Sequence, residues 1–480
     1  MQIRKGHTGI IIDPYKKGQC RMLEKMTSVY DYVKRRYEPL TGYCINLGDR
    51  DVFVTHPMFD TFLHSQFSTY DLIQLKSSKS LSIEPFQLND DIIPTEIQHY
   101  VISEIMKSKY HSWYVHLSQG MGKTLLSVYL ISVFRRKTLI MCFRKKILNQ
   151  WYATLKEKTD IDINRVLIVD SSKIFKKIVE GSFPVEKFDI FLCTPGIITS
   201  YAKRNSYEDI DILMKKMGIG FKIYDEAHRD IKNMILINGF SNVDKTLYLS
   251  GDKKQSNDIN TSRFQKMFQL TQFITPDKEI TDKLKYIVGV VVNYNTYPSS
   301  IDEMSCYEKR GFSFFNCMKY EIENKRFYDA LFYTFDHIMK SNQGKHRILI
   351  LTHMVEHVDI IYENMCSRYK DKMIFGKFYS DIDDNEKDYV KMNADCIVAT
   401  YLSFSTGLDA PNIRYVISTS PCSIIDDNQS SGRARPLPSG EDCFYFMLND
   451  IGFEYNINKI EKRVSYLLET KLKKCIKINV

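Results

Sequence analysis

The 480-residue sequence lacks any segment suited to entering or crossing a membrane. No apolar run approaches the roughly 18 residues that a membrane-spanning helix needs. The short apolar run near the N-terminus is broken by Asp13 and Pro14, and no small-residue cleavage site follows it. We therefore expect a soluble chain without a signal peptide and without a membrane partner.

Cysteine pairs of the Cys-x-x-Cys type are also absent, although the chain holds 11 cysteines. Several of them, such as Cys142 and Cys193, stand inside apolar, strand-like runs. Buried free thiols in a reducing compartment explain this pattern better than a zinc site or a disulfide framework. Low-complexity tracts are missing too, and 44% hydrophobic and 26% charged residues are typical of a globular protein.

The length exceeds what one hydrophobic core supports, so we expect at least two domains. The formal net charge is +9. A mild basic excess is compatible with a polyanionic partner but does not by itself indicate one.

The strongest local signal is the stretch SWYVHLSQGMGKTLLSVYLISVF at residues 112–134, a strand, a loop and a buried helix. Glycines at 120 and 122 let successive backbone N–H groups point at a phosphate. Lys123 supplies a charge for the β- and γ-phosphate oxygens, and Thr124 supplies a hydroxyl for Mg²⁺. The predicted ATP loop comprises Leu117, where the strict pattern has glycine, and Ser118, Gln119, Gly120, Met121, Gly122, Lys123 and Thr124.

A second apolar strand, FKIY, ends in Asp225-Glu226-Ala227-His228 roughly 100 residues downstream. A phosphate-binding loop needs such an acidic partner, because Mg²⁺ is held from the opposite side of the nucleotide. Asp225 is placed to bind Mg²⁺, and Glu226 to polarise the attacking water. His228 has no evident ATP chemistry, and we expect it to touch a second lobe.

A GKT loop followed by a DEAH box at this distance resembles the superfamily 2 helicases and translocases. The resemblance implies an α/β fold of two tandem RecA-like P-loop lobes with parallel sheets, plus a small N-terminal α/β appendage. The layout is similar to compact viral members of the poxviral transcript-release type, with XPB-like and phage recombination helicases as neighbours. It predicts an appendage over 1–90, lobe 1 over 91–278, and lobe 2 over 279–480 with a closing basic helix.

Further motifs of lobe 1 follow the family order. Gln98 in IIPTEIQHY resembles an adenine-contacting glutamine, and a polar residue on a first helical turn is an equally good alternative. Two segments resemble the family's contacts with the nucleic-acid backbone. They are the segment 138–155, with its L-x-Q-W ending in Trp151, and the turn at Thr194. Ser250 matches the start of a Ser-Ala-Thr motif, but Gly251 and Asp252 replace its other residues. This departure bears on the coupling of hydrolysis to strand separation more than on ATP binding.

In lobe 2, Gly407 and Asp409 resemble a motif that senses both nucleotide and strand. The stretch QSSGRAR matches the family pattern Q-x-x-G-R-x-x-R at Gln429, Gly432 and Arg433. The last arginine falls one place early, at Arg435. The resemblance implies that Arg433 and Arg435 reach the γ-phosphate and stabilise charge in the transition state. A solvated basic turn is the alternative.

Two further patterns of lobe 2 are interpreted as structural. His353 and His357 lie four residues apart, and without a third ligand a solvated helix face is favoured over a metal pair. The C-terminal stretch predicts one closing helix packed on lobe 2. Its apolar stripe comprises Ile460, Val464, Leu467, Leu468 and Leu472.

The motifs together predict an ATP hydrolase that moves along DNA or RNA through largely sequence-independent backbone contacts. An ATP-gated clamp or scaffold in a transcription complex is the alternative, motivated by Gly251, Asp252 and Pro436. A P-loop kinase leaves the DEAH box and the late arginines without a role. The resemblance also points to RNA polymerase or replication proteins as partners and to a cytoplasmic or virion location.

Overall fold

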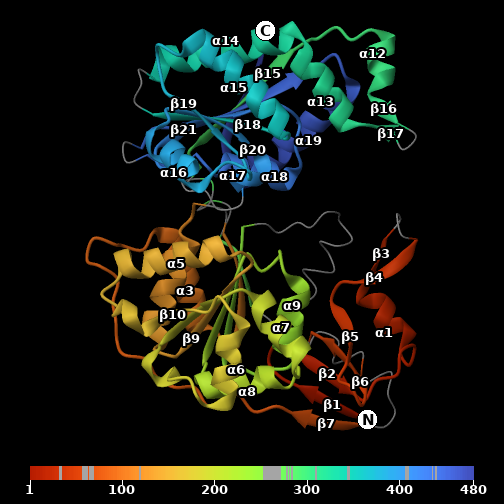
Figure 1. Cartoon of the computed structure of the whole chain (residues 1–480), viewed down its shortest axis with the longest axis vertical. Coiled ribbons are helices and arrows are strands. Elements are labelled where there is room, and N and C mark those ends of the chain that lie inside the picture. Colours follow the sequence, from red (N-terminus) through yellow and green to blue (C-terminus); the bar gives the residue numbers. More distant parts are fainter. Residues whose placement is uncertain are drawn as a thin grey trace. The chain divides into compact units, whose positions relative to one another are not determined.

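The computed structural model describes residues 1–31, 35–56, 63, 70–117, 120–251, 272–276, 279, 282, 285–308, 311–342, 346–405, 410–434, 436–437 and 440–480. The packing of the Cα atoms divides the chain into two compact units. The first comprises Met1–Leu117 and Met121–Asp277, and the second comprises Ser118–Gly120 and Lys278–Val480. Each unit is built around a seven-stranded sheet (Figure 1).

The N-terminal part of the first unit is a five-stranded sheet with the order β5-β6-β2-β1-β7. Helix α1 (Arg21–Met26) and the two-stranded ribbon β3–β4 accompany it. The strands are β1 (Gln2–Lys5), β2 (Ile10–Asp13), β3 (Ser28–Asp31), β4 (Arg36–Pro39), β5 (Gly42–Asn46), β6 (Asp51–Thr55) and β7 (Asp71–Gln74). The segment is thus a mixed α/β appendage, as the sequence predicts.

This N-terminal sheet packs tightly on helix α9 (Ile231–Gly239). A Cβ atom on Gly239 would lie 2.2 Å from Val54 Cγ1, and one on Gly9 would lie 2.2 Å from the Asn238 carbonyl oxygen. Only glycine allows the two backbones to come so close. Because Ile11 and Val54 belong to the same apolar cluster as the first lobe, the appendage and the lobe share one core.

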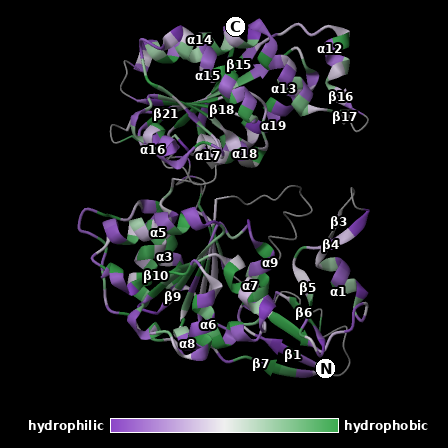
Figure 2. Cartoon of the chain, in the orientation of Figure 1, coloured by the Kyte–Doolittle hydropathy of each residue, from purple (hydrophilic) through white to green (hydrophobic). Residues whose placement is uncertain are grey.

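The lobe of the first unit has seven parallel strands in the order β10-β11-β9-β12-β13-β8-β14. The strands are β8 (Ser112–His116), β9 (Thr138–Cys142), β10 (Val166–Ile168), β11 (Ile190–Cys193), β12 (Phe221–Asp225), β13 (Lys245–Ser250) and β14 (Gln272–Ile274). The central strands are buried along most of their length and mainly apolar, because helices cover both faces of a parallel sheet (Figure 2).

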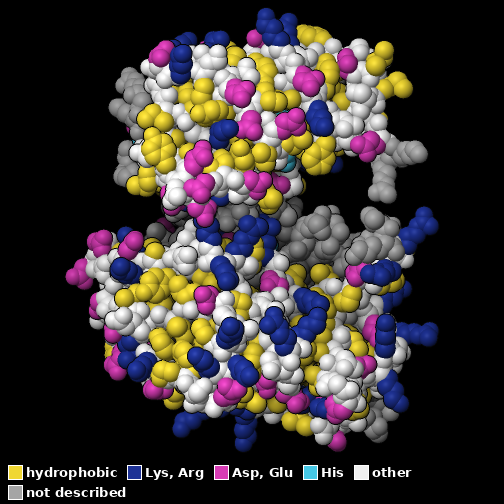
Figure 3. Space-filling view, in the orientation of Figure 1, with side chains coloured by type: hydrophobic (Ala, Val, Ile, Leu, Met, Phe, Trp, Pro, Cys, Tyr) yellow, Lys and Arg dark blue, Asp and Glu magenta, His cyan; other side chains and the backbone are white. Residues whose placement is uncertain are grey.

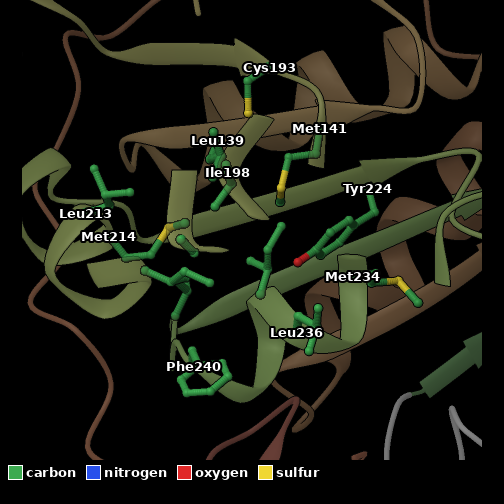
Figure 4. Packing of buried hydrophobic residues seen from close by; sticks show 14 of the residues in the cluster. Leu139, Met141, Cys193, Ile198, Leu213, Met214, Tyr224, Met234, Leu236 and Phe240 are labelled. Carbon is green, nitrogen blue, oxygen red and sulfur yellow. The ribbon is translucent and has the colours of Figure 1, made fainter. Parts of the chain in front are cut away.

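The helices of this lobe are α3 (Glu96–Lys107), α4 (Lys123–Phe134), α5 (Lys145–Lys158), α6 (Ser172–Glu180), α7 (Pro195–Arg204), α8 (Asp209–Met217) and α9 (Ile231–Gly239). Short 3-10 turns lie at Ile163–Arg165 and Val185–Lys187. Figure 4 shows how Ile198, Met214 and Leu236 of the helices meet Met141 and Tyr224 of the strands. This apolar layer holds the helices against the sheet and so fixes the positions of the strand ends.

The second unit repeats the plan with the parallel order β19-β20-β18-β21-β22-β15-β23. Along β15, Val288 and Val290 belong to the cluster on one face, whereas Ile287 and Val291 belong to the cluster on the other. This alternation shows that both faces are buried. The strands are β15 (Ile287–Tyr294), β18 (Arg347–Thr352), β19 (Phe375–Phe378), β20 (Cys396–Thr400), β21 (Ile413–Ser418), β22 (Cys443–Asp450) and β23 (Leu472–Asn479).

The helices of the second unit are α12 (Ser300–Ser305), α13 (Phe314–Glu323), α14 (Lys325–Asn342), α15 (Val355–Tyr369), α16 (Asp384–Asn393), α17 (Tyr401–Ser405), α18 (Ile424–Ser431) and α19 (Glu454–Thr470). A small ribbon, β16 (Tyr307–Glu308) and β17 (Gly311–Phe312), lies between α12 and α13. Together the two lobes confirm the predicted α/β architecture with tandem parallel sheets.

The prediction for the C-terminus is wrong in its last third. Helix α19 ends at Thr470, and Leu472 begins strand β23, which pairs in parallel with β15. The lysines that the sequence suggested as a polar helix face instead line an edge strand, where charge discourages pairing with other chains. Leu468, assigned to the apolar stripe, is 38% exposed.

Within the described part of the chain, no helix combines the length and apolar character that a bilayer crossing requires. All 11 cysteines are free, and eight of them are buried. The prediction of buried free thiols is therefore confirmed for most of them.

Candidate functional site

The loop between β8 and α4 has the backbone that phosphate binding requires. Gly120 and Gly122 have φ angles of 85° and 74°, and Gly122 is the N-cap of α4. These left-handed conformations favour glycine and leave the free N–H groups of the helix start accessible. Leu117 is 1% exposed, and its N–H donates to the Ser250 carbonyl at 3.1 Å. Its contribution to the loop is therefore made by its backbone.

Lys123 and Glu226 face each other at this loop. Lys123 Nζ lies 3.1 Å from Glu226 Oε1, and the two side chains are only 11% and 16% exposed. Glu226 directly follows β12 with a φ of 52°, a left-handed backbone that non-glycine residues rarely adopt and that occurs often at functional sites. The two motifs that the sequence predicts to act together therefore meet in the first unit.

Asp225 is held by an indole. Trp151 Nε1 of α5 donates to Asp225 Oδ2 at 2.9 Å, and the Trp151 side chain is 1% exposed. The buried Trp151 side chain supports the end of β12. Contact of the segment 138–155 with nucleic acid stays a prediction. This partner of Asp225 was missed, since 74 residues separate the two in sequence.

The pKa values of the adjacent carboxyl groups of Asp225 and Glu226 are shifted in opposite directions. Burial raises the pKa of Asp225, and the neighbouring Glu226 charge raises it further. Burial acts in the same direction on Glu226, but the Lys123 ammonium and His228 outweigh it and lower the pKa of Glu226. Glu226 is thus kept as a carboxylate that can accept a proton or a hydrogen bond.

His228 lies beside Glu226 in the same site. Its side chain is 4% exposed, its Nδ1 lies 2.9 Å from Ser250 Oγ, and the same nitrogen lies 3.4 Å from Glu226 Oε2. A contact of His228 with the second lobe stays a prediction. The contact connects the DEAH segment directly to the end of β13, where the Ser-Ala-Thr-like motif begins.

Gln98 reaches the loop from the first turn of α3. Its Oε1 accepts from the Thr95 N–H at 2.8 Å in a capping box, and its Nε2 donates to the Gly122 carbonyl at 3.0 Å. Gln98 thus caps a helix, as the alternative interpretation expects, and it also lies beside the loop. Contact with adenine stays a prediction.

Four more predicted residues of lobe 1 are half-buried or at the surface. Met121 and Thr124 are half-buried, and Gly120 is exposed. Thr194 is the N-cap of α7, with Pro195 in the first helical position. Several predicted residues lie outside the described residues: Ser118, Gln119, Asp252, Gly407, Asp409 and Arg435.

In the second unit, α18 carries Gln429, which is 4% exposed. The helix ends in a turn in which the Arg433 N–H donates to the Ser430 carbonyl at 3.0 Å. The Arg433 side chain is half-buried, and Ala434 is fully buried. The turn is therefore built into the lobe rather than fully solvated.

The reading of His353 and His357 as a solvated helix face is wrong. His357 is 3% exposed, and burial lowers the pKa of both imidazoles. His353 precedes α15; its Nε2 lies 3.0 Å from the Pro421 carbonyl oxygen, and its ring lies 4.9 Å from that of Phe314. Among the described residues, no group of three or more metal-type side chains converges here or elsewhere.

Comparison with known proteins agrees with this arrangement. Residues 91–271 match the family described as type III restriction enzyme, res subunit, a stretch that contains Gln98, Lys123, Asp225 and Glu226. Transcript termination protein A18 of Yaba monkey tumor virus (strain VR587) is 22% identical over 318 residues, covering 62% of this chain and 59% of that protein. The chain resembles superfamily 2 helicases, viral ones among them.

A second relative, A18 of fowlpox virus (strain NVSL), is 24% identical over 312 residues, covering 62% of this chain and 61% of that protein. The match thus spans about three fifths of the length of these relatives. Among solved structures, S. cerevisiae Dbp5 bound to RNA and ADP BeF3 aligns with a TM-score of 0.52 at 12% identity, covering 80% of this chain and 90% of that chain.

Mss116p bound to ssRNA and AMP-PNP aligns with a TM-score of 0.51 at 16% identity, covering 80% of this chain and 74% of that chain. At these identities the likeness concerns the fold alone. The fold is two tandem RecA-like lobes, similar to those of these solved structures, here preceded by an N-terminal sheet.

Proposed function

We propose that the protein is a nucleic-acid-dependent ATPase, a helicase or translocase that couples ATP hydrolysis to movement along DNA or RNA. One observation carries the proposal: Lys123, at the start of α4, meets Glu226 across a glycine loop, with Asp225 beside it. This combination of loop, helix N-terminus, ammonium and paired carboxylates serves phosphoryl transfer.

The described residues fit a nucleoside triphosphate with Mg²⁺. Gly122 and the first turn of α4 present N–H donors, and Lys123 adds a full positive charge. Asp225 and Thr124 offer the oxygen ligands that Mg²⁺ prefers, and the bound ion would neutralise charge on the phosphates. Trp151 holds the Asp225 carboxylate in one orientation, as outer-shell partners of metal ligands do.

Hydrolysis requires a group that orients water. Glu226 is a buried carboxylate with a depressed pKa, and its side chain lies at the loop beside Lys123. We assign it the role of general base. The contact from His228 to Ser250 offers a route by which changes at Glu226 reach the end of β13.

The motifs of the second unit would complete the site. We propose that Arg433 and Arg435 stabilise the transition-state charge, and that Gly407, Asp409 and Gln429 help bind the nucleotide. The placement of Gln429 and Arg433 on and after the well-packed helix α18 supports this role.

Nucleic acid is the proposed partner, held through its sugar–phosphate backbone. The names of the relatives support this, since Dbp5 and Mss116p were solved with RNA and the poxviral proteins are named for transcript termination. The chain carries a net charge of +9, and many Lys and Arg side chains cover the displayed face of the first unit (Figure 3). We propose a role in viral-type transcription or replication, in the cytoplasm or the virion, beside an RNA polymerase or replication proteins.

ATP hydrolysis with single- and double-stranded DNA and RNA tests the proposal. Lys123→Ala is expected to lose ATP binding, because the main charge on the phosphates is gone. Glu226→Gln is expected to bind ATP as the unsubstituted protein does while turnover falls by about 10²-fold or more. If the unsubstituted protein does not hydrolyse ATP with any of these polynucleotides, the proposed activity is wrong.

Arg433→Ala and Arg435→Ala provide a second test at the other end of the sequence. Each is expected to leave ATP binding nearly unchanged while turnover falls by about 10³–10⁵-fold, the contribution typical of finger arginines. Binding is measured with a fluorescent ATP analogue and turnover by phosphate release. Unchanged turnover in the double variant would show that this stretch is only a basic turn without a role in hydrolysis.

An ATP-gated clamp is the second candidate, favoured by Gly251 and Asp252 in place of the Ala-Thr pair. Strand displacement on a duplex with a single-stranded tail separates the two. The helicase displaces the strand in an ATP-dependent manner, whereas the clamp hydrolyses ATP on nucleic acid without displacing it.

A further inference from the structure

Helix α18 is buried mainly through polar side chains. Its eight residues are IIDDNQSS, and five consecutive polar residues at its C-terminal end, Asp427 to Ser431, are each no more than 4% exposed. Such a helix gains little from apolar burial, so its orientation must come from polar contacts. Gln429 lies on this helix, and Arg433 follows directly after it.

The strongest of these contacts is a buried ion pair. Arg463 of α19 donates through Nε to Asp427 Oδ2 at 2.5 Å and through Nη2 to Asp427 Oδ1 at 2.7 Å. The two side chains are 1% and 0% exposed. Burial alone would lower the pKa of Arg463, but the Asp427 carboxylate raises it well above its usual range, so the guanidinium stays charged.

Other elements complete the shell around Asp427. The Tyr445 hydroxyl of β22 donates to Asp427 Oδ1 at 2.7 Å, and the Cys422 thiol donates to the same oxygen at 3.1 Å. Arg463 Nη2 also donates to Ser418 Oγ at 3.0 Å, at the end of β21. The ion pair thus joins α18 to α19, to β22 through Tyr445 and to the end of β21 through Ser418.

Two further contacts hold the same segment through its backbone. Lys471, which follows α19 and is 5% exposed, donates from Nζ to the Asn428 carbonyl. The Tyr286 hydroxyl, just before β15, donates to the Ala434 carbonyl at 3.0 Å. The segment 427–434 is therefore fixed near its start and at its end.

A purely stabilising role explains this arrangement poorly. Replacing a buried ion pair with apolar residues of similar volume is often neutral or favourable for stability. What the bidentate pair adds is direction, since a guanidinium and a carboxylate meet in one plane. That direction is useful where a nearby residue has to be aimed.

We propose that Arg463 is a positioning residue for ATP turnover, acting through Asp427 to set the orientation of α18 and thereby of Gln429 and Arg433. The proposal rests on the function proposed above and adds to it a residue of the C-terminal helix. Arg463 itself touches neither nucleotide nor nucleic acid in this account.

The test replaces the pair as a whole, with Asp427→Leu and Arg463→Met combined, so that neither charge is left buried alone. The matched control is Glu321→Met with Asn456→Leu. This second buried pair also involves α19, and there the Asn456 amide donates to Glu321 Oε1 of α13 at 2.8 Å, away from α18. Both double variants are compared in thermal unfolding, in kcat and KM for ATP, and in hydrogen exchange of the backbone over 424–434.

Positioning predicts that the Asp427/Arg463 variant loses about ten- to a hundredfold in kcat at an unchanged KM for ATP. Its exchange over 424–434 should also become faster, while the control keeps both values even at a similar unfolding temperature. Unchanged kcat, or unchanged exchange over 424–434, in the Asp427/Arg463 variant overturns the proposal. If the unsubstituted protein shows no ATP turnover, the proposed function fails instead, and the exchange rates still decide whether the pair orients α18.

Discussion

Gly122 joins three features of the site at one residue. It is the N-cap of α4, its φ is 74°, and its carbonyl accepts a hydrogen bond from Gln98. A Cβ atom at this position would lie 2.3 Å from Gln98 Nε2. Any larger residue would therefore strain the backbone and push away the side chain that the family resemblance assigns to adenine.

Gly122→Ala is compared with Gly181→Ala, a helix C-cap in the same unit. Gly181 has a similar φ of 78°, but its Cβ would meet nothing nearer than Lys216 Nζ at 3.8 Å. Both variants should lose about 1–2 kcal/mol of stability from the left-handed backbone. Only Gly122→Ala is expected to weaken ATP binding, by about tenfold or more, as measured with a fluorescent analogue; equal affinities would contradict this role.

At the scale of single residues, the sequence predicts the motif residues well and their supporting partners poorly. Lys123 and Glu226 were predictable as partners because each motif implies the other. Trp151 as the partner of Asp225, and Ser250 as the partner of His228, depend on how α5 and β13 pack. No local pattern encodes these contacts. His357 was misjudged for the same reason, since its burial depends on packing in the second unit.

At the scale of elements, strand β12 carries a buried lysine just before the DEAH box. Lys222 is fully buried, and it donates to Asn238 Oδ1 of α9 at 2.7 Å and to Ser241 Oγ at 3.4 Å. Asn238 Oδ1 also accepts a hydrogen bond from the Tyr224 hydroxyl, and Asn238 Nδ2 donates one to the Tyr248 hydroxyl. This network fastens α9 to the sheet under the site.

Burial lowers the pKa of Lys222 to about 7 from the ordinary value of 10.5. Between these two values the unfolded chain binds more protons than the folded one, so stability rises with pH across this window. Below about pH 7 the full penalty for the buried charge is present. Lys222→Met should therefore stabilise the first unit more at pH 6 than at pH 9, by on the order of a few kcal/mol.

Denaturant unfolding of the first unit at the two pH values measures this difference. Lys176→Met, at an exposed lysine of α6 that pairs with Glu180, is the control and should show no such change. An equal effect of Lys222→Met at pH 6 and pH 9 would show that burial does not shift this lysine in the folded protein.

The elements themselves were largely predictable, because apolar runs of strand length alternate with helical patterns over both lobes. The exception is the C-terminus, where helix α19 stops at Thr470 and β23 follows. Lysines alternate irregularly with apolar residues there, and such a pattern suits the polar face of a helix as well as an edge strand. The interpretation of α19 as a helix with an apolar stripe also missed Arg463, which is charged and yet lies on the buried face of α19.

At the scale of the whole molecule, the sequence predicts the class of fold, two parallel-sheet lobes and an α/β appendage, and the structure confirms it. The boundaries at 90 and 278 stay predictions. The appendage shares a core with the first lobe through the close approach at Gly239, which depends on tertiary contact alone. The roles of Gly407, Asp409 and Arg435 also stay predictions, because these residues lie outside the described part of the chain.

In the proposed function, ATP and nucleic acid each change the affinity of this protein for the other. Coupling between two binding sites is reciprocal. If a ligand at the Lys123 site changes the affinity for a nucleic-acid strand by some factor, the strand changes the affinity for that ligand by the same factor. The measurement is the Kd for a fluorescent single strand, with and without a saturating, non-hydrolysable ATP analogue. This Kd is expected to change by about fivefold or more in the unsubstituted protein and to stay the same in Lys123→Ala. An unchanged Kd in the unsubstituted protein, with the analogue shown to be bound, would contradict the proposed function.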